Sequence, residues 1–481
     1  MQDGIRLQDE DLDHAFDEEA VGFGVPYEVP AHQRTDEGPT LLLRLALGLV
    51  VAGLVALLLQ LTSGQLLGSW PGLAAGLGLP TVGGALYFWE RYRHQAAGIR
   101  NDGVFFSGTM SRGLVGWLLG VAMTAFYVAL YWFPSYIGFA PGHAAADGSW
   151  VPAEASGLTL LVDPLARAMT GRPADQWFLY TVVYTLAVVV FGVRMAMRYR
   201  HSRYHLWRTA SVVVFQTGLA FLLPELLKRF NQPSFYPTYF WPLKRDVLMP
   251  GALGQDWTTG AGAIGWWMIG FAAAMTVLAT PVLTWLYGKR WYCSWVCGCG
   301  GLAETLGDPW RHLSSKSRAA WRLERVLIYA VLVWITALTA VLWLNHVRGG
   351  ELLGSSGAGL ERFYGFWIGS MFAGVAGVGF YPILGSRVWC RFGCPQAAIL
   401  GILQRFLSRF RITTNGGQCI SCGNCSTYCE MGIDVRAYAQ EGRNIVRASC
   451  VGCGVCASVC PRGVLKLENG PSVLGEERRM D

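Results

Sequence analysis

The chain has 481 residues, of which 52% are hydrophobic and only 15% are charged, and its formal net charge is +7. Soluble globular proteins carry about 25% charged residues, so this composition excludes an ordinary soluble enzyme. The apolar residues gather in runs of about 20, the length that crosses a bilayer as a helix. Lys and Arg lie between these runs and form no basic face, which excludes nucleic-acid binding as the reason for the positive charge.

Residues 1–39 form an acidic head, with eleven Asp and Glu against two Arg. The head has few apolar residues and no hydrophobic periodicity, so we expect it to be disordered. It also lacks the basic region that begins a signal peptide. We therefore expect the first apolar run to remain as a membrane anchor.

Eight apolar runs predict an all-α membrane protein with about eight transmembrane helices. They cover approximately residues 40–62, 67–89, 113–140, 178–198, 207–225, 262–286, 324–345 and 364–384. If the N-terminus is inside, the inner loops hold sixteen Lys and Arg and the outer loops hold eight. Cytoplasmic loops carry the excess of positive residues. The pattern therefore predicts a prokaryotic inner-membrane protein with both termini in the cytoplasm.

The C-terminal region carries two cysteine runs with the same spacing, C-x-x-C-x-x-C-x-x-x-C, separated by 31 positions. In such runs three thiolates hold one [4Fe-4S] cluster, and the fourth cysteine ligates the other cluster. We therefore predict two clusters in this region. The expected ligands are Cys419, Cys422, Cys425 and Cys460 for the first cluster, and Cys429, Cys450, Cys453 and Cys456 for the second.

Structural zinc and disulfides are the alternatives for these eight cysteines. A duplicated pattern of three cysteines plus one is unusual for zinc, and a cytoplasmic location disfavours disulfides. Residues 415–466 resemble the bacterial two-cluster ferredoxins, which implies a small α+β domain. Glu430 stands where these ferredoxins usually have Pro, and we expect it to change the local turn without removing a ligand.

A second repeat lies closer to the membrane, where residues 288–297 match residues 385–394 at an offset of 97. Each copy contains a C-x-x-x-C motif directly after a predicted span, so four thiols could converge at the cytoplasmic face. Four convergent thiols suit a third iron–sulfur cluster or a soft metal such as copper, although buried inert thiols remain an alternative. The four are Cys293, Cys297, Cys390 and Cys394, with Cys299 as a spare ligand.

Two C-x-x-x-C motifs after membrane helices, followed by a two-cluster tail, resemble the membrane-bound polyferredoxin family of the NapH, NosR and CcoG type. The resemblance covers approximately residues 207–470. It implies electron transfer along or across the membrane, or reduction of a metal during enzyme assembly. The sequence departs from the family where Cys297 is followed by Gly298 and Cys299 and not by Pro. The first four predicted spans and the acidic head lie outside the resemblance.

These patterns divide the chain into six parts. They are the acidic head 1–39, additional helices 40–206, polyferredoxin-type helices 207–395, an interfacial amphipathic helix 396–410, a two-cluster domain 411–470 and a tail 471–481.

Several other cofactors are not expected. The eight His lie in the head, in loops or at span ends, so no haem is predicted inside the membrane. No motif for a nucleotide is present, and no flavin is predicted. His201 and His205 lie among five Arg, and we expect a solvated basic turn or a contact with lipid phosphate there. The five are Arg194, Arg198, Arg200, Arg203 and Arg208.

No catalytic residues can be named, which favours an electron-transfer subunit of an oxidoreductase complex over a stand-alone enzyme. We expect it to connect a membrane redox partner, with quinol as a candidate, to another redox protein. One alternative is a metal-reducing or maturation factor for a respiratory metalloenzyme. Another is a structural anchor in a larger respiratory or photosynthetic complex. The expected partners are membrane lipid and redox subunits, and no nucleic acid.

Overall fold

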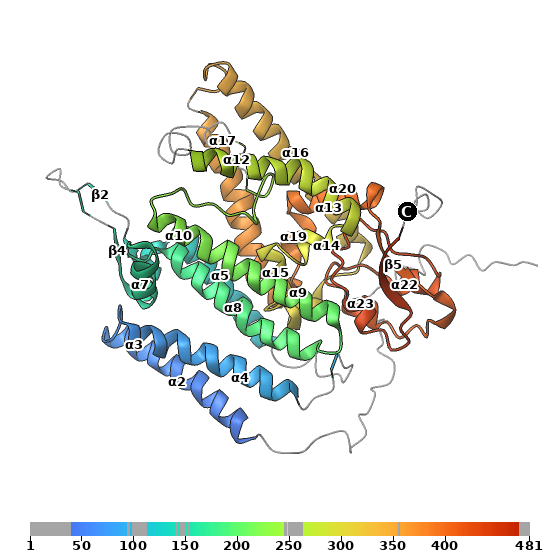
Figure 1. Cartoon of the computed structure of the whole chain (residues 1–481), viewed down its shortest axis with the longest axis horizontal. Helices are drawn as coiled ribbons and strands as arrows, with labels where there is room; N and C mark the ends of the chain where they lie inside the picture. Colours follow the sequence, from blue (N-terminus) through green and yellow to red (C-terminus); the bar gives the residue numbers. More distant parts are fainter. Residues whose placement is uncertain are drawn as a thin grey trace, which may run out of the picture.

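The computed structural model describes residues 40–93, 97–98, 113–140, 143–144, 150–151, 153–244, 248, 263–354 and 356–470. The predicted acidic head and the tail 471–481 lie outside the described residues. The described part is mostly helical, and its helices form a bundle that carries a smaller cysteine-rich lobe at one end (Figure 1). We call residues 410–470 the C-terminal lobe.

Six helices in the described ranges are long and apolar enough to cross a membrane. Each coincides with a predicted span. They are α2 (Leu41–Ser63), α5 (Leu114–Trp132), α8 (Gln176–Arg198), a continuous helix Arg203–Arg229 made of α9, η5 and α10, a second continuous helix Gly265–Tyr287 that ends in α13 (Thr280–Tyr287), and α16 (Arg318–Val347).

The other two predicted spans, 67–89 and 364–384, are also helical but are not among these six. The first consists of α3 (Trp70–Leu73), η2 (Ala74–Gly78) and α4 (Leu79–Arg93), and the second of α17 (Ser356–Tyr364), η10 (Gly365–Gly379) and α18 (Tyr381–Leu384). Both are rich in glycine, which allows neighbouring helices to approach closely. A Cβ atom on Gly83, for example, would lie 2.7 Å from the carbonyl oxygen of Ala46 on α2.

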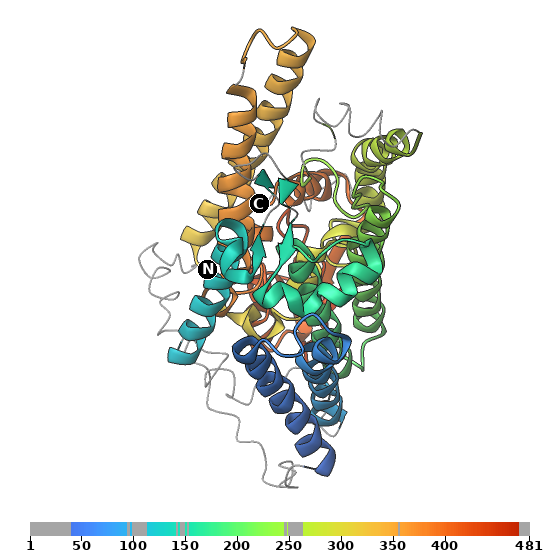
Figure 2. The ribbon, with the colours of Figure 1, turned by 90° about the vertical axis from the view of Figure 1, so that its left-hand side faces the viewer.

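The helices follow one another across the bundle. Helix α2 packs on α4, α4 on α8, and α8 on α9, and the first pair forms one edge of the molecule (Figure 2). Between α5 and α8 the chain forms α6 (Pro134–Ile137), two short antiparallel pairs of strands and α7 (Gly157–Thr170). The paired strands are β1 (Phe139–Ala140) with β4 (Glu154–Ala155), and β2 (His143–Ala144) with β3 (Trp150–Val151).

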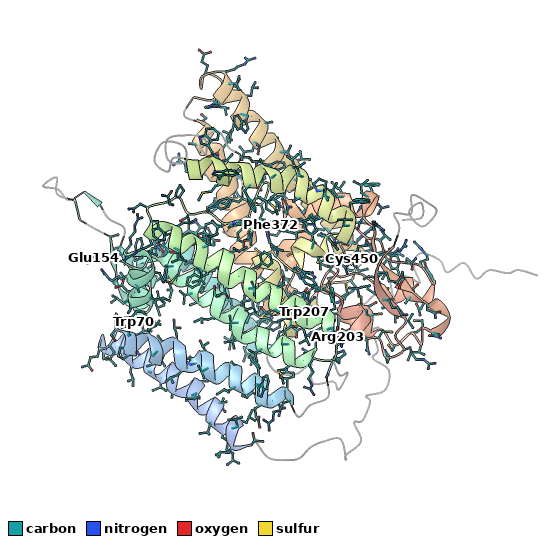
Figure 3. All side chains as sticks on the ribbon, in the orientation of Figure 1. Trp70, Glu154, Arg203, Trp207, Phe372 and Cys450 are labelled. Atoms are coloured by element: carbon teal, nitrogen blue, oxygen red, sulfur yellow. The ribbon has the colours of Figure 1, made fainter. Side chains whose placement is uncertain are left out.

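These outer elements lie at the opposite end of the bundle from the C-terminal lobe, whereas the first residues of α2 point toward the end that carries the lobe (Figure 1). Figure 3 shows the same division, because Trp70 and Glu154 lie at one end and Cys450 near the other.

Short helices connect the bundle to the lobe. They are α14 (Arg290–Cys293), α15 (Gly298–Glu304), η9 (Asp308–Leu313), α19 (Val388–Phe392) and α20 (Pro395–Leu407). Helix α20 corresponds to most of the predicted interfacial helix. It buries Ala397, Leu400 and Gln404 and exposes Phe406 and Leu407, as expected for an amphipathic helix.

The C-terminal lobe combines short helices with one antiparallel pair of strands. Strand β5 (Phe410–Thr414) pairs with β6 (Leu465–Asn469), with Phe410 opposite Asn469 and Thr414 opposite Leu465. Between the strands lie η11 (Gly416–Gln418), α21 (Asn424–Thr427), α22 (Val435–Gln440) and α23 (Val455–Ser458). The strands thus bring the two ends of the lobe together beside the bundle.

Gly432 marks a close approach between the lobe and the bundle. Its φ is +67°, and a Cβ atom there would collide with the guanidinium of Arg391 and the carbonyl oxygen of Ser315. Gly463 has a similar φ of +63°, but nothing lies within 4 Å of its Cβ position. Substitutions at these two glycines therefore distinguish the destabilisation caused by backbone strain from that caused by a collision with the bundle.

We predict that Gly432→Ala destabilises the protein by about 2–3 kcal/mol, because strain and a collision with the bundle act together. Gly463→Ala should cost only about 1 kcal/mol, because it adds strain alone. Thermal unfolding of both variants in detergent checks this. Equal midpoints for the two variants would contradict the described packing of lobe on bundle.

Candidate metal centres and the ion pairs between them

The C-terminal lobe contains two cavities, and each is lined by four cysteines. Cys419, Cys422, Cys425 and Cys460 line the first cavity. Cys429, Cys450, Cys453 and Cys456 line the second. Each cavity therefore takes three thiols from one motif and the fourth from the other, in the combination expected from the spacing. The donor set and the enclosed space fit a thiolate-ligated cluster.

The two motifs also share their backbone conformation at an offset of 31. Ser421 and Gly452 have positive φ of 57° and 62°, and Gly423 and Gly454 have φ of 76° and 81°. These left-handed residues turn the chain around the thiols, and glycine adopts this conformation without steric cost. The internal duplication of the sequence is thus a duplication of structure.

The fourth cysteine of each motif accepts the same backbone hydrogen bond. Ile433 N donates to Cys429 Sγ, and Val464 N donates to Cys460 Sγ, both at 3.4 Å. Hydrogen bonds to sulfur stabilise the thiolate form, which is the form that ligates iron.

The four membrane-proximal thiols are brought together by the second repeat. Cys293 ends α14, Cys297 caps α15, Cys390 lies in α19 and Cys394 caps α20. All four side chains are buried in one core. The turns are equivalent at the offset of 97, because Cys297 N donates to the carbonyl oxygen of Tyr292 and Cys394 N to that of Trp389. We call these four cysteines the thiol quartet.

Cys299 lies beside the thiol quartet. Its thiol hydrogen-bonds that of Cys297, and this bond, together with backbone N–H groups, lowers the pKa of Cys297 to about 7 despite burial. Burial raises the pKa of Cys293 to about 12. Cys297 therefore ionises more readily than Cys293, so the four thiols of the quartet are not chemically equivalent.

The distances between ligand atoms show which groups of side chains are close enough to share one metal ion. Among the described residues, the one group of three or more Cys, His, Asp and Glu ligand atoms within 4.8 Å of one another is Glu304, Glu430 and Cys453. No three sulfurs of the quartet, and no three sulfurs of either cysteine set in the lobe, lie within 4.8 Å of one another.

Between the thiol quartet and the lobe lies a buried network of eight charged side chains. All eight side chains are at most 8% exposed. The network contains the carboxylates Glu304, Asp308 and Glu430 and the guanidinium groups of Arg194, Arg198, Arg208, Arg311 and Arg387. Arginine exceeds carboxylate by two, so this buried region is positive.

Asp308 anchors the side of the network that faces α8. Its carboxylate lies 2.6 Å from Arg194, 2.7 Å from Arg198 and 3.0 Å from Arg311. Burial alone would raise the pKa of Asp308, but the three guanidinium groups outweigh burial and hold it well below its usual range. Asp308 is therefore ionised and fixes α8 to η9.

Glu304 and Glu430 form the centre of the network. Glu304 lies 2.7 Å from Arg208, 2.7 Å from Arg387 and 3.3 Å from Arg311. Glu430 lies 3.2 Å from Arg311 and 3.1 Å from Arg387. One oxygen of each carboxyl group lies within 4.8 Å of the other. Burial raises the pKa of Glu430, whereas the arginines overcome burial and lower that of Glu304.

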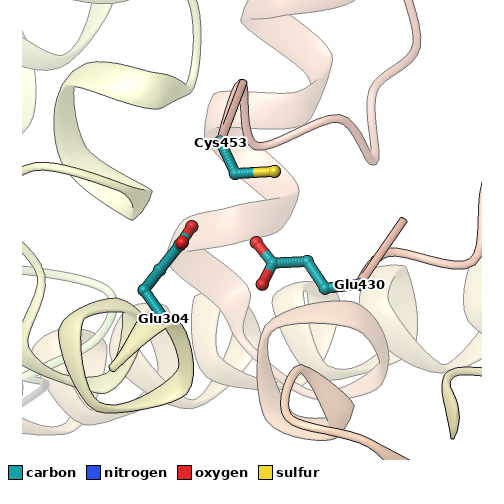
Figure 4. Close-up of side chains that lie close together, drawn as sticks. All are labelled: Glu304, Glu430 and Cys453. Atoms are coloured by element: carbon teal, nitrogen blue, oxygen red, sulfur yellow. The ribbon is translucent and has the colours of Figure 1, made fainter. Parts of the chain in front are cut away.

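Figure 4 shows the carboxyl groups of Glu304 and Glu430 directed toward each other beside the thiol of Cys453. These three ligand atoms are close enough for a cation, but the guanidinium groups of Arg311 and Arg387 already pair with both carboxylates. The trio is therefore better described as part of the ion-pair network.

The network touches cysteines on both sides. Arg387 donates to Cys390 Sγ at 3.6 Å and to the carbonyl oxygen of Cys293 at 3.2 Å. Arg311 Nη1 lies 3.9 Å from Cys453 Sγ in the lobe. Because both arginines pair with both central glutamates, one continuous set of contacts joins the thiol quartet to the second cysteine cavity.

One expectation from the sequence is corrected here in part. The Arg-rich segment around His205 is not wholly a solvated turn, because Arg194, Arg198 and Arg208 are buried in the network, whereas Arg200, His201 and Arg203 are exposed. His205 itself is 1% exposed. Its ring stacks on that of Tyr199, with 4.8 Å between the ring centres. The reason is that Asp308 and Glu304, from a distant part of the chain, neutralise these arginines.

Two family models match the cysteine-containing segments of this site. Residues 418–465 match the family model of a 4Fe-4S dicluster domain. Residues 267–318 and 366–413 each match the model of a 4Fe-4S binding domain, and these two segments contain the thiol quartet. The expected resemblance to ferredoxin-type iron–sulfur proteins is thereby confirmed.

Two curated proteins are similar to this chain. The putative electron transport protein YccM of Escherichia coli (strain K12) is 26% identical over 171 residues, which cover 34% of this chain and 48% of that protein. The methylamine utilization ferredoxin-type protein MauN of Methylobacillus flagellatus is 28% identical over 171 residues, which cover 33% of this chain and 56% of that protein. The chain thus spans about half the length of these relatives. No solved structure matches it.

The residues of the network are what sequence reasoning missed. Arg387 was visible as a repeated residue, but its counterpart Arg290 lies instead over the ring of Phe410, 4.4 Å from its centre. Glu430 was visible as a departure from the ferredoxin pattern, and the structure places it at 0% exposure among arginines. Glu430, an acidic residue where ferredoxins usually have Pro, is thus the one sequence signal from which part of the network could have been found.

We predict that Glu304→Gln destabilises the protein more than Glu430→Gln. Removing the charge of Glu304 leaves three buried arginines short of a partner, which costs about 3–5 kcal/mol. Glu430→Gln keeps a hydrogen-bonding group at a position with weaker ion pairs. Thermal unfolding and limited proteolysis between bundle and lobe measure both effects. Equal stability of the two variants would contradict a central role for Glu304 in the network.

Proposed function

We propose that the chain is a membrane-bound iron–sulfur electron-transfer protein. It carries 4Fe-4S binding regions and helices able to cross a membrane, and it is similar to a putative electron transport protein and to a ferredoxin-type protein. It would connect a redox partner in the membrane, with quinol as the candidate, to a second redox protein. The observation that carries the proposal is the continuous set of contacts from the thiol quartet through Arg387, the two glutamates and Arg311 to Cys453.

The cysteine sets have distinct roles in this proposal. The first cavity of the lobe would hold one [4Fe-4S] cluster on Cys419, Cys422, Cys425 and Cys460, and the second would hold another on Cys429, Cys450, Cys453 and Cys456. The thiol quartet would hold a third cluster. The 4Fe-4S binding model that matches both segments of the quartet supports a cluster over a single copper ion. Bound clusters supply reversible one-electron chemistry at these positions.

The protein's own residues would set the conditions for that chemistry. The network places an excess of positive charge between thiolate sites, and this charge would compensate for negative sulfur ligands in a buried region. Arg387 and Arg311 approach sulfur directly, and hydrogen bonds to sulfur tune the potential of such sites. The network also keeps the lobe in a fixed position on the bundle.

The sets differ in their access to solvent. Cys422 of the first cavity is exposed, whereas the thiol quartet is buried beside the membrane helices. This order supports a path with its membrane end at the quartet and its soluble end at the first cavity. We place the lobe and both termini in the cytoplasm and the bundle in a prokaryotic inner membrane, in agreement with the distribution of Lys and Arg in the loops.

The crossed ligation is tested with two matched serine variants. Cys460→Ser, although it lies in the second motif, should abolish the EPR signal of the cluster in the first cavity and leave the other. Cys429→Ser should do the reverse. If each substitution instead affected the cluster of its own motif, the ligand assignment would be wrong.

The metal-reducing alternative makes a different prediction. Under that hypothesis the thiol quartet binds copper, and replacing all four cysteines with serine would remove copper and leave the iron content unchanged. Under the electron-transfer proposal the same variant loses iron.

A further inference from the structure

A cavity of about 540 Å³ lies where the bundle, α20 and the C-terminal lobe meet. Its walls come from the first turns of α16, from α19 and α20, and from residues 431–449 of the lobe. Cys390 forms part of its inner wall. None of the roles proposed above uses this cavity.

The charge of the cavity is strongly positive. Glu324 is the one carboxylate among the described residues that line it, and it is already paired with Arg391 at 2.7 Å. The cationic residues of the lining are Lys289, Arg325, Arg391, Arg405 and Arg447. One carboxylate against five cations favours an anionic ligand.

An aromatic side chain orients two of these cations. The Trp321 ring lies 4.9 Å from the Arg325 guanidinium and 5.5 Å from that of Arg447. Arg447 also donates to the Tyr438 hydroxyl at 3.4 Å. Cation–π contacts of this kind hold guanidinium groups in place, so one arginine of α16 and one of the lobe are held against the same ring.

The surroundings of the cavity are apolar and exposed. On α16, Leu323 is 50% and Val326 66% exposed, and on α20 Phe406 is 58% and Leu407 47% exposed. Helix α16 continues from this point as one of the helices able to cross a membrane. The cavity therefore lies where a span leaves the lipid, beside an amphipathic helix whose exposed apolar residues suit a membrane interface.

We propose that this cavity binds the phosphate headgroup of an anionic membrane phospholipid, with its acyl chains along the exposed apolar side chains of α16 and α20. Basic pockets between membrane helices at the cytoplasmic side bind such headgroups, and arginine pairs with phosphate through two hydrogen bonds. The cavity has room for more than a phosphate. A lipid here would join Arg325 of the bundle to Arg447 of the lobe and would cover the wall that contains Cys390.

The test measures binding of phosphatidylglycerol to the full-length protein, purified in an uncharged detergent, by native mass spectrometry. The double variant Arg325→Gln/Arg405→Gln removes two cations of the lining. Arg318→Gln/Arg322→Gln is the matched control, because it removes two exposed cations of α16 that do not line the cavity. We expect the lining variant to bind about tenfold more weakly than wild type and the control to bind as wild type does.

Phosphatidylcholine should not compete with phosphatidylglycerol, and inorganic phosphate should compete only weakly. Equal binding by the lining variant and the control would overturn the proposal. Full displacement by inorganic phosphate would show a site for a small anion, and displacement by a short-chain quinone would show a site for a redox ligand. Either result would also overturn it. Iron content and EPR spectra of the same samples report on the electron-transfer proposal separately.

Discussion

A charge that leaves water must find a partner inside the protein, and this constraint organises the junction between bundle and lobe. Three carboxylates from α15, η9 and the lobe meet five arginines from α8, α9, η9 and the start of α19. Because each element supplies charges that its own neighbourhood cannot neutralise, the elements are stable only when assembled. The cysteine sets are positioned as a consequence, since Cys293, Cys390 and Cys453 all contact the arginines of this network.

The assembly follows two duplications of different length. The offset of 31 repeats the thiols, the left-handed turns and the sulfur hydrogen bonds of the lobe, and the offset of 97 repeats the turns that hold the thiol quartet. The contacts of the ion-pair network are not repeated in either duplication. Glu430 has Pro461 as its counterpart in the lobe repeat, and Arg387 is buried whereas its counterpart Arg290 is not. The junction therefore depends on contacts that the two copies of each repeat do not share.

Much of the architecture could be predicted because its signals are local. The apolar runs predicted eight membrane helices, and six of these are long and apolar enough to cross a membrane in the described ranges. The cysteines that the spacing groups together also line the same cavity. The network could not be predicted in the same way. Arg194, Arg198 and Arg208 resemble ordinary positive-inside residues, and only the approach of Asp308 and Glu304, about a hundred residues later in the chain, distinguishes them. The two Gly-rich segments also show the limit of hydropathy, because they are helical without meeting the criterion for a span.

The central claim is that the thiol quartet is a metal centre of the same kind as the two sets in the lobe. Its most direct test is the iron and acid-labile sulfide content of the anaerobically purified protein, measured together with copper. Three clusters correspond to about twelve iron atoms per chain, and the variant with serine at all four quartet positions should retain about eight. A wild-type content of about eight iron atoms, unchanged in that variant, would contradict the claim.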